Sequence, residues 1–164
     1  MKTLLLMRHA KSSWSEPGLA DHDRPLNKRG KHSAPEMGKL LRKEGLVPDL
    51  ILCSTARRSR QTAEAVAEAC GYEGTVESQR DLYYSDAACY MDILRHLPDW
   101  ANRVLVVGHN PETEELLEVL TGSAERMTTA AIAHLDLPIS HWAELSEALD
   151  VPILHLWLPR ELQG

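Results

Sequence analysis

The chain alternates short apolar runs with longer stretches in which apolar residues recur every three or four positions. Short apolar runs bounded by turn residues are typical of buried strands, and the longer spacing is typical of amphipathic helices. The pattern predicts strands at residues 3–7, 49–53, 75–77, 104–107, 131–137 and 152–158. It predicts helices at residues 56–70, 87–97 and 112–120. A further helix is expected within 28–44, where Pro35 would mark the first turn or kink the helix.

Strands that alternate with helices predict an α/β fold, a three-layer α/β/α sandwich around a mostly parallel central sheet. The chain has 164 residues and a mass of 18.4 kDa, which is the size of one ordinary domain. We see no internal repeat and no low-complexity linker, so a single domain over residues 1–164 is expected. In such sheets, sites form beyond the carboxyl ends of the strands.

The charge balance narrows the classes of partner. The chain carries 18 Lys and Arg against 24 Asp and Glu, a formal net charge of −6. An acidic protein is a poor candidate for non-specific binding to nucleic acid or to a membrane surface. The first apolar run is interrupted at Arg8, and no run approaches a membrane span, so neither a signal peptide nor an anchor is expected.

Three cysteines, Cys53, Cys70 and Cys89, carry little information about chemistry. Their number is odd and their spacings of 17 and 19 residues form no CxxC pair. A disulfide framework or a thiolate zinc site is therefore not expected, and all three are predicted to be small buried side chains. This cysteine usage favours a reducing cytoplasm.

Basic and imidazole side chains follow three of the predicted strands. Arg8 and His9 follow the first, Arg57, Arg58 and Arg60 follow the second, and His109 follows the fourth. Because the carboxyl ends of parallel strands meet at one edge of a sheet, these groups should gather there. Each alone has a simpler interpretation, as a solvated charge or a structural histidine.

The three arginines stand in the first turn of the predicted helix at 56–70, after a natural N-cap at Ser54 or Thr55. The amino end of a helix is effectively positive, so cations there are unfavourable by about 0.3–1 kcal/mol each. A bound anion would offset this cost, and arginine forks and helix N-termini both suit phosphate. One of the three arginines is expected to be merely solvated, and another is expected to meet the anion.

A long polar connection, residues 10–27, contains the run Asp21-His22-Asp23-Arg24. Long ordered loops beside a strand end are often functional. The carboxylates and the imidazole could bind a metal, Arg24 could join the anion site, or Asp21 and Asp23 could pair with nearby arginines.

Three segments together resemble the histidine phosphatase superfamily, which is phosphoglycerate mutase-like in fold. They are Leu6-Met7-Arg8-His9-Ala10, the S-x-x-x-R-x-x-Q-T-A pattern over residues 54–63, and Val106-Val107-Gly108-His109-Asn110-Pro111. Their order matches the family over nearly the whole chain. Residues 23–30 and the closing Leu158-Pro159-Arg160-Glu161-Leu162 are similar to the SixA-type phosphohistidine phosphatases of this superfamily.

The resemblance implies a role for each matching residue. His9 matches the nucleophile, and Arg8 and Arg58 match the two phosphate-binding arginines. His109 matches the second histidine, and Arg24 matches a further phosphate contact of the SixA branch. The implied enzyme needs no metal and no cofactor, passes through a phosphorylated His9, and belongs to signal transduction.

One departure from the family bears on the substrate. Many members carry a general-acid Glu in an L-x-E pattern, whereas Leu82 is followed here by Tyr83 and Tyr84. An alkoxide leaving group needs a proton, but imidazole is a far better leaving group, so phosphohistidine is favoured. The expected partner is a phosphorylated protein, such as a phosphotransfer domain, or a small phosphate compound, and the expected state is a monomer.

Three other functions stay open at this point. The chain could hydrolyse a small phosphomonoester, with Asp21, Asp23 or water supplying the proton. It could bind phosphate without turnover, or it could be a metal hydrolase that uses Asp21, His22 and Asp23.

Overall fold

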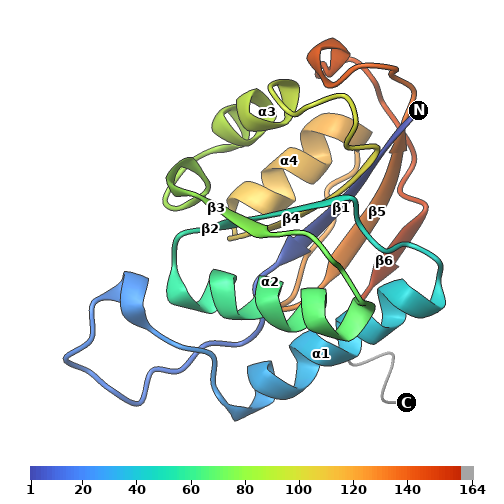
Figure 1. Ribbon diagram of the computed structural model, residues 1–164. Helices are drawn as coiled ribbons and strands as arrows, with labels where there is room; N and C mark the ends of the chain where they lie inside the picture. Colours follow the sequence, from blue (N-terminus) through green and yellow to red (C-terminus); the bar gives the residue numbers. More distant parts are fainter. Residues whose placement is uncertain (160–164) are drawn as a thin grey trace.

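The computed structural model describes residues 1–159 and contains a six-stranded sheet with the order β3-β2-β4-β1-β5-β6 (Figure 1). The strands are β1 (Lys2–Arg8), β2 (Leu50–Ser54), β3 (Val76–Gln79), β4 (Arg103–Gly108), β5 (Ile132–Leu137) and β6 (His155–Trp157). β1, β2, β3 and β4 are parallel, and β5 is antiparallel to both of its neighbours.

Helices cover both faces of the sheet (Figure 1). They are α1 (Lys28–Lys43), α2 (Arg57–Cys70), α3 (Ala87–Arg95) and α4 (Glu112–Thr121). Each face has its own apolar cluster: α1 and α2 pack on one, and α3 and α4 pack on the other. The prediction of a three-layer α/β/α sandwich with a mostly parallel sheet is thus confirmed.

Successive residues of β1 point to opposite faces, so Leu4 and Leu6 enter one cluster and Leu5 and Met7 enter the other. This explains why the strand is an unbroken apolar run rather than an alternating one. In the pairing of β1 with β4, Arg8 lies opposite Gly108. The two strands therefore end at the same level, and the residues after them are neighbours.

Two predicted elements differ from the structure. β6 spans only three residues, although a strand was expected at 152–158. Pro152 has no amide hydrogen for the ladder, which favours a later start to the strand. Pro35 is the eighth residue of α1, so of the two alternatives expected for it, the first turn is excluded. Arg160–Leu162 of the closing segment lie outside the described residues.

The prediction for the cysteines holds for two of the three. Cys53 and Cys70 are buried, and burial raises the pKa of the Cys53 thiol to about 12. Cys89 is exposed, which corrects the prediction. It stands in the first turn of α3, whose buried residues are Tyr90, Met91 and Leu94. Over residues 1–159, no helix is both long and apolar enough to cross a membrane.

Candidate active site

The carboxyl ends of β1, β4 and β2 bring His9, His109 and Arg58 together. The two imidazole ring centroids are 5.0 Å apart. All three side chains are buried, with residue exposures of 7% for His9, 6% for His109 and 4% for Arg58. The sheet order β2-β4-β1 makes this gathering a direct result of topology.

The backbone fixes the tautomer of His9. The His9 Nδ1 atom lies 2.7 Å from the carbonyl oxygen of Ala10. A carbonyl oxygen only accepts hydrogen bonds, so Nδ1 carries the hydrogen and Nε2 of the neutral ring keeps its lone pair. The His9 amide donates to the Gly108 carbonyl at 3.0 Å, which ties this turn to the end of β4. An imidazole held in this way presents Nε2 as a nucleophile.

Burial and nearby cations keep both histidines neutral. Burial is the main cause that lowers the pKa of His9 to about 4, and Arg58, Arg8 and Arg24 lower it further. Burial also lowers the pKa of His109 to about 3, helped by His9 and Arg58. A neutral His9 is the form that can attack an electrophile.

The pKa of His9 predicts the acid side of the pH profile. The unprotonated ring is the active form, so activity should persist below the ordinary histidine pKa of about 6.5 and fall as pH drops through about 4. The measurement is kcat/KM against pH, because it reports the free enzyme. Two substrates with different phosphate pKa values separate the enzyme's limb from that of the substrate. An acid limb at pH 6–7 with both would contradict the assignment.

Ser54 supports His109 rather than capping a helix. Its hydroxyl shares a 2.6 Å hydrogen bond with Nε2 of His109 and accepts a weaker one from the Ala56 amide. The expectation that Ser54 or Thr55 caps α2 is therefore wrong. The N-cap is Ala56, whose methyl group makes no hydrogen bond, and the Thr55 hydroxyl is engaged with His22 at 2.9 Å.

One of the three arginines at the start of α2 is buried and two are exposed, one more than expected. Arg57 and Arg60 are exposed, and Arg58 is buried. The Arg58 guanidinium donates to the Asp21 carbonyl at 2.7 Å and to the Asp21 carboxylate at 3.0 Å. Its Nε atom is buried without a hydrogen-bond partner, and so is Nε of Arg8. Both guanidinium groups thus keep an unused donor.

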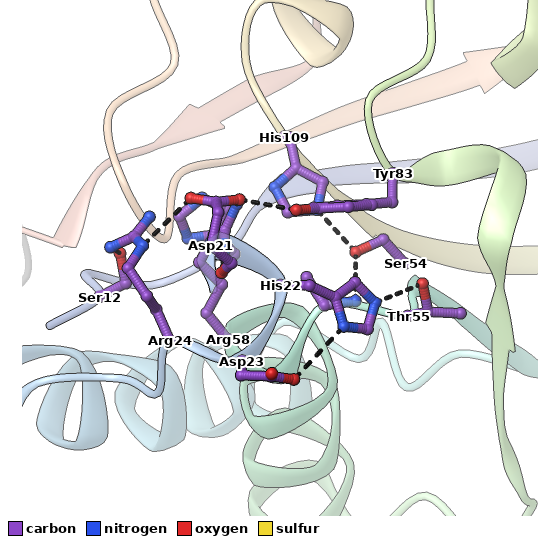
Figure 2. A network of polar contacts seen from close by, with 12 residues as sticks. Ser12, Asp21, His22, Asp23, Arg24, Ser54, Thr55, Arg58, Tyr83 and His109 are labelled. Atoms are coloured by element: carbon purple, nitrogen blue, oxygen red, sulfur yellow. Dashed lines mark hydrogen bonds and ion pairs between the residues drawn. The ribbon is translucent and has the colours of Figure 1, made fainter. Parts of the chain in front are cut away.

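Asp21 joins the two sides of the site (Figure 2). One carboxylate oxygen accepts from Arg24 Nε at 3.1 Å, and the other accepts from Arg58 and from the Tyr83 hydroxyl at 2.8 Å. Partial burial raises the pKa of Asp21, but the contacts with Tyr83, Tyr84 and Arg58 outweigh it and hold this pKa well below its usual range. Asp21 is therefore an ionised acceptor and a poor proton donor.

Of the two carboxylates in residues 21–24, Asp21 pairs with arginine as expected. Asp23 lies beside His22 instead, at 3.7 Å. Within the described part of the chain, no three His, Cys, Asp or Glu side chains form a group that could hold a metal ion. His22 and Asp21 are both engaged with other partners.

Arg24 is buried and fixed by the loop that carries it. Its NH1 donates to the Ser12 hydroxyl at 2.8 Å and to the Ser13 carbonyl at 3.1 Å. Its guanidinium carbon lies 3.5 Å from the centre of the Trp14 ring, a close cation–π contact. The residues around it thus hold the guanidinium in one place.

A cavity of about 440 Å³ opens at this edge of the sheet. It is lined by Arg8, His9, Lys11, Ser12, Trp14, Arg24, Arg58, Thr128 and Thr129. Four of the five predicted site residues therefore line one cavity, and His109 lies against His9 without lining it. Burial lowers the pKa of Arg8, but an arginine still keeps its charge, so the cavity is strongly cationic.

The sequence reasoning missed the roles of Ser54, Tyr83 and Trp14. Ser54 was considered as a helix cap and as the first residue of the family pattern over residues 54–63, and Tyr83 as a departure from the family's L-x-E pattern. The polar loop that carries Trp14 was identified as a candidate functional segment. A large aromatic residue in such a polar loop was the signal that could have identified Trp14 itself.

Comparisons with known proteins place the chain in a family. Residues 4–83 match the family model of the histidine phosphatase superfamily (branch 1). An uncharacterized chloroplastic protein of Arabidopsis thaliana is 32% identical over 152 residues, 87% of this chain and 70% of that protein. An uncharacterized protein of Mycobacterium tuberculosis is 35% identical over 150 residues, 85% of this chain and 91% of that protein.

Solved structures of the same superfamily share the fold of this chain. A crystal structure assigned to the phosphohistidine phosphatase SixA of Agrobacterium tumefaciens superposes with a TM-score of 0.83. The sequence identity is 28%, and the match covers 96% of this chain and 98% of that one. The phosphoglycerate mutase-like fold expected from the sequence is thereby confirmed.

Proposed function

The chain belongs to the histidine phosphatase superfamily, and we propose that it is a metal-independent phosphatase that removes phosphate from phosphohistidine in a protein. The observation that carries the proposal is His9: neutral, with Nε2 unprotonated, in a cavity lined by Arg8, Arg24 and Arg58. Such a cavity offers a nucleophile and the charges that a phosphoryl group needs.

The reaction proceeds in two transfers. Nε2 of His9 attacks phosphorus, a new P–N bond forms, and the P–N bond of the substrate breaks. The substrate imidazole departs neutral when its other nitrogen carries a proton. Water then attacks the phosphorylated His9, which releases inorganic phosphate and restores the free imidazole. Phosphoryl transfer depends mainly on positioning and on stabilising the equatorial oxygens, the task assigned here to the three arginines.

Two titratable groups of the site, Tyr83 and Asp21, support a P–N substrate. Burial and the hydrogen bond to Asp21 raise the pKa of Tyr83 above its ordinary value, and the carboxylate of Asp21 is already ionised. Neither group is a suitable acid for an alkoxide at neutral pH. A leaving group that needs no proton from the protein fits this environment better.

A small phosphomonoester is the second candidate, because 440 Å³ lies within the range of small-ligand pockets. The experiment compares kcat/KM for a histidine-phosphorylated protein, phosphoramidate, p-nitrophenyl phosphate and sugar phosphates, with and without EDTA. We expect both P–N substrates to be preferred, with no effect of EDTA. Preference for a phosphomonoester would favour the second candidate, and loss of activity in EDTA would favour a metal hydrolase.

Single-turnover labelling tests for a module that binds phosphate without turnover. A phosphorylated adduct on His9 is expected from the enzyme and not from a binding module.

The proposal includes a monomer in a reducing cytoplasm. The free, buried Cys53 and Cys70 support the reducing compartment.

Oxyanions should stabilise the fold. Phosphate that binds only the folded protein adds about 2.7 kcal/mol at 100 times its Kd, which raises Tm by roughly 5–10 °C for a domain of this size. The measurement is Tm in phosphate or tungstate against chloride at matched ionic strength. Replacing Arg8 or Arg58 should remove most of the rise. Equal shifts in phosphate and chloride would refute the site.

A further inference from the structure

We propose that Trp14 and Tyr84 form a docking surface for a phosphorylated protein, one on each side of Asp21. This proposal rests on the proposed function and adds the residues that recognise the substrate outside the phosphate cavity. Among residues 1–159, the large hydrophobic side chains that are exposed are Met1, Trp14, Tyr84, Trp100 and Leu154. Two of these five, Trp14 and Tyr84, are each 75% exposed and contact the residues that bind Asp21.

Trp14 stands on the Arg24 side. One face of its ring covers the Arg24 guanidinium, and Arg24 in turn binds one oxygen of Asp21. The residue also lines the cavity that contains His9. Since Trp14 is mostly exposed, much of its surface is available to a substrate whose phosphoryl group has entered the cavity.

Tyr84 stands on the other side. Its ring lies 4.3 Å from that of Tyr83, centre to centre, and Tyr83 binds the other oxygen of Asp21. Tyr84 also has a backbone φ of 47°, in the left-handed region that is unfavourable for a bulky residue. Residues held in such sparsely populated conformations cluster at functional sites.

The position of Tyr84 outside the cavity means that only a large substrate can contact it. Tyr84 is not among the residues that line the cavity, whereas Trp14 is. A phosphate compound that fits within the cavity can reach Trp14 but has no need of Tyr84. Only a substrate that extends past Asp21 can contact both aromatics, and a folded protein that presents a phosphorylated histidine does so.

The chemistry of the surface suits a protein. The cationic cavity anchors the phosphoryl group, and exposed aromatic rings beside such an anchor are the residues that most often dominate protein interfaces. The phosphoryl group thus fixes where the partner sits, and the rings contact the surface around its histidine.

The test compares a histidine-phosphorylated phosphotransfer domain with phosphoramidate, two P–N substrates of very different size. Tyr84→Ala is expected to raise KM for the domain roughly 10-fold, by the usual effect of losing an interface aromatic, and to change the phosphoramidate KM far less. Tyr84→Phe, which keeps the ring, should restore most of the affinity. Trp14→Ala should affect both substrates, because it also releases Arg24.

Trp100→Ala is the matched control. Trp100 is 63% exposed but lies three residues before β4, at the opposite edge of the sheet. It should change neither KM. Equal effects of Tyr84→Ala on both substrates, or no effect on either, would overturn the docking surface and leave the phosphatase standing. Hydrolysis of phosphoramidate but not of the phosphorylated domain by the unmodified protein would instead overturn the protein substrate itself.

Discussion

His9→Ala is expected to abolish turnover while the protein stays folded. The substitution removes the atom that accepts the phosphoryl group, and loss of a nucleophile typically lowers kcat by about 10⁴-fold or more. His9 contributes one side chain at the end of β1, and the apolar clusters on the two faces of the sheet do not depend on it. The measurement is kcat with phosphoramidate, together with circular dichroism.

Binding provides the control for this variant. Arg8, Arg24 and Arg58 remain in His9→Ala, so phosphate should still raise its Tm. Radiolabelled substrate should label the unmodified protein on His9 and leave the variant unlabelled. Substantial hydrolysis by a folded His9→Ala protein would exclude the covalent mechanism.

Arg58→Ala should lower kcat/KM far more than Arg57→Ala. A charge-assisted contact to phosphate is worth about 1.5–3 kcal/mol, which corresponds to a loss of roughly 10- to 100-fold. Arg58 is buried against Asp21 and lines the cavity, whereas its neighbour Arg57 is exposed. The same loss of charge at two adjacent positions therefore separates a local contact from a general effect on the field.

The two variants, Arg57→Ala and Arg58→Ala, also test which of the two arginines contacts the phosphate. Arg58→Lys keeps the charge without the planar fork and should recover only part of the activity. An equal loss at both positions, or a larger loss in Arg57→Ala, would show that the wrong arginine has been placed at the phosphate.

The sheet and its functional edge could be predicted because they depend on local patterns and one rule of topology. The apolar runs of β1, β2 and β4 fix three parallel strands, and parallel strands place their following residues at the same edge. His9, Arg58 and His109 are each adjacent or nearly adjacent to such an end. Their proximity thus required no knowledge of the loops.

The polar contacts of the site depended on tertiary structure and could not be resolved from sequence. Asp21 reaches Arg58 and Tyr83 only because the loop over residues 10–27 folds back across the strand ends. Ser54 has the local preference of a helix cap, but a buried imidazole competes for the same hydroxyl, and burying that imidazole without a partner is more costly. Tertiary context decided both cases.

The hydrogen bond that fixes His9 comes from the main chain, and this affects how the protein tolerates mutation. The acceptor is the carbonyl of Ala10, a group that every amino acid possesses. The Ala10 amide is itself held by the Thr62 hydroxyl at 3.0 Å. Whether position 10 carries alanine or glycine, the carbonyl remains and the imidazole keeps its tautomer. Exchange between these two small residues at a fully buried position can therefore occur without loss of the nucleophile, so long as the path of the backbone is unchanged.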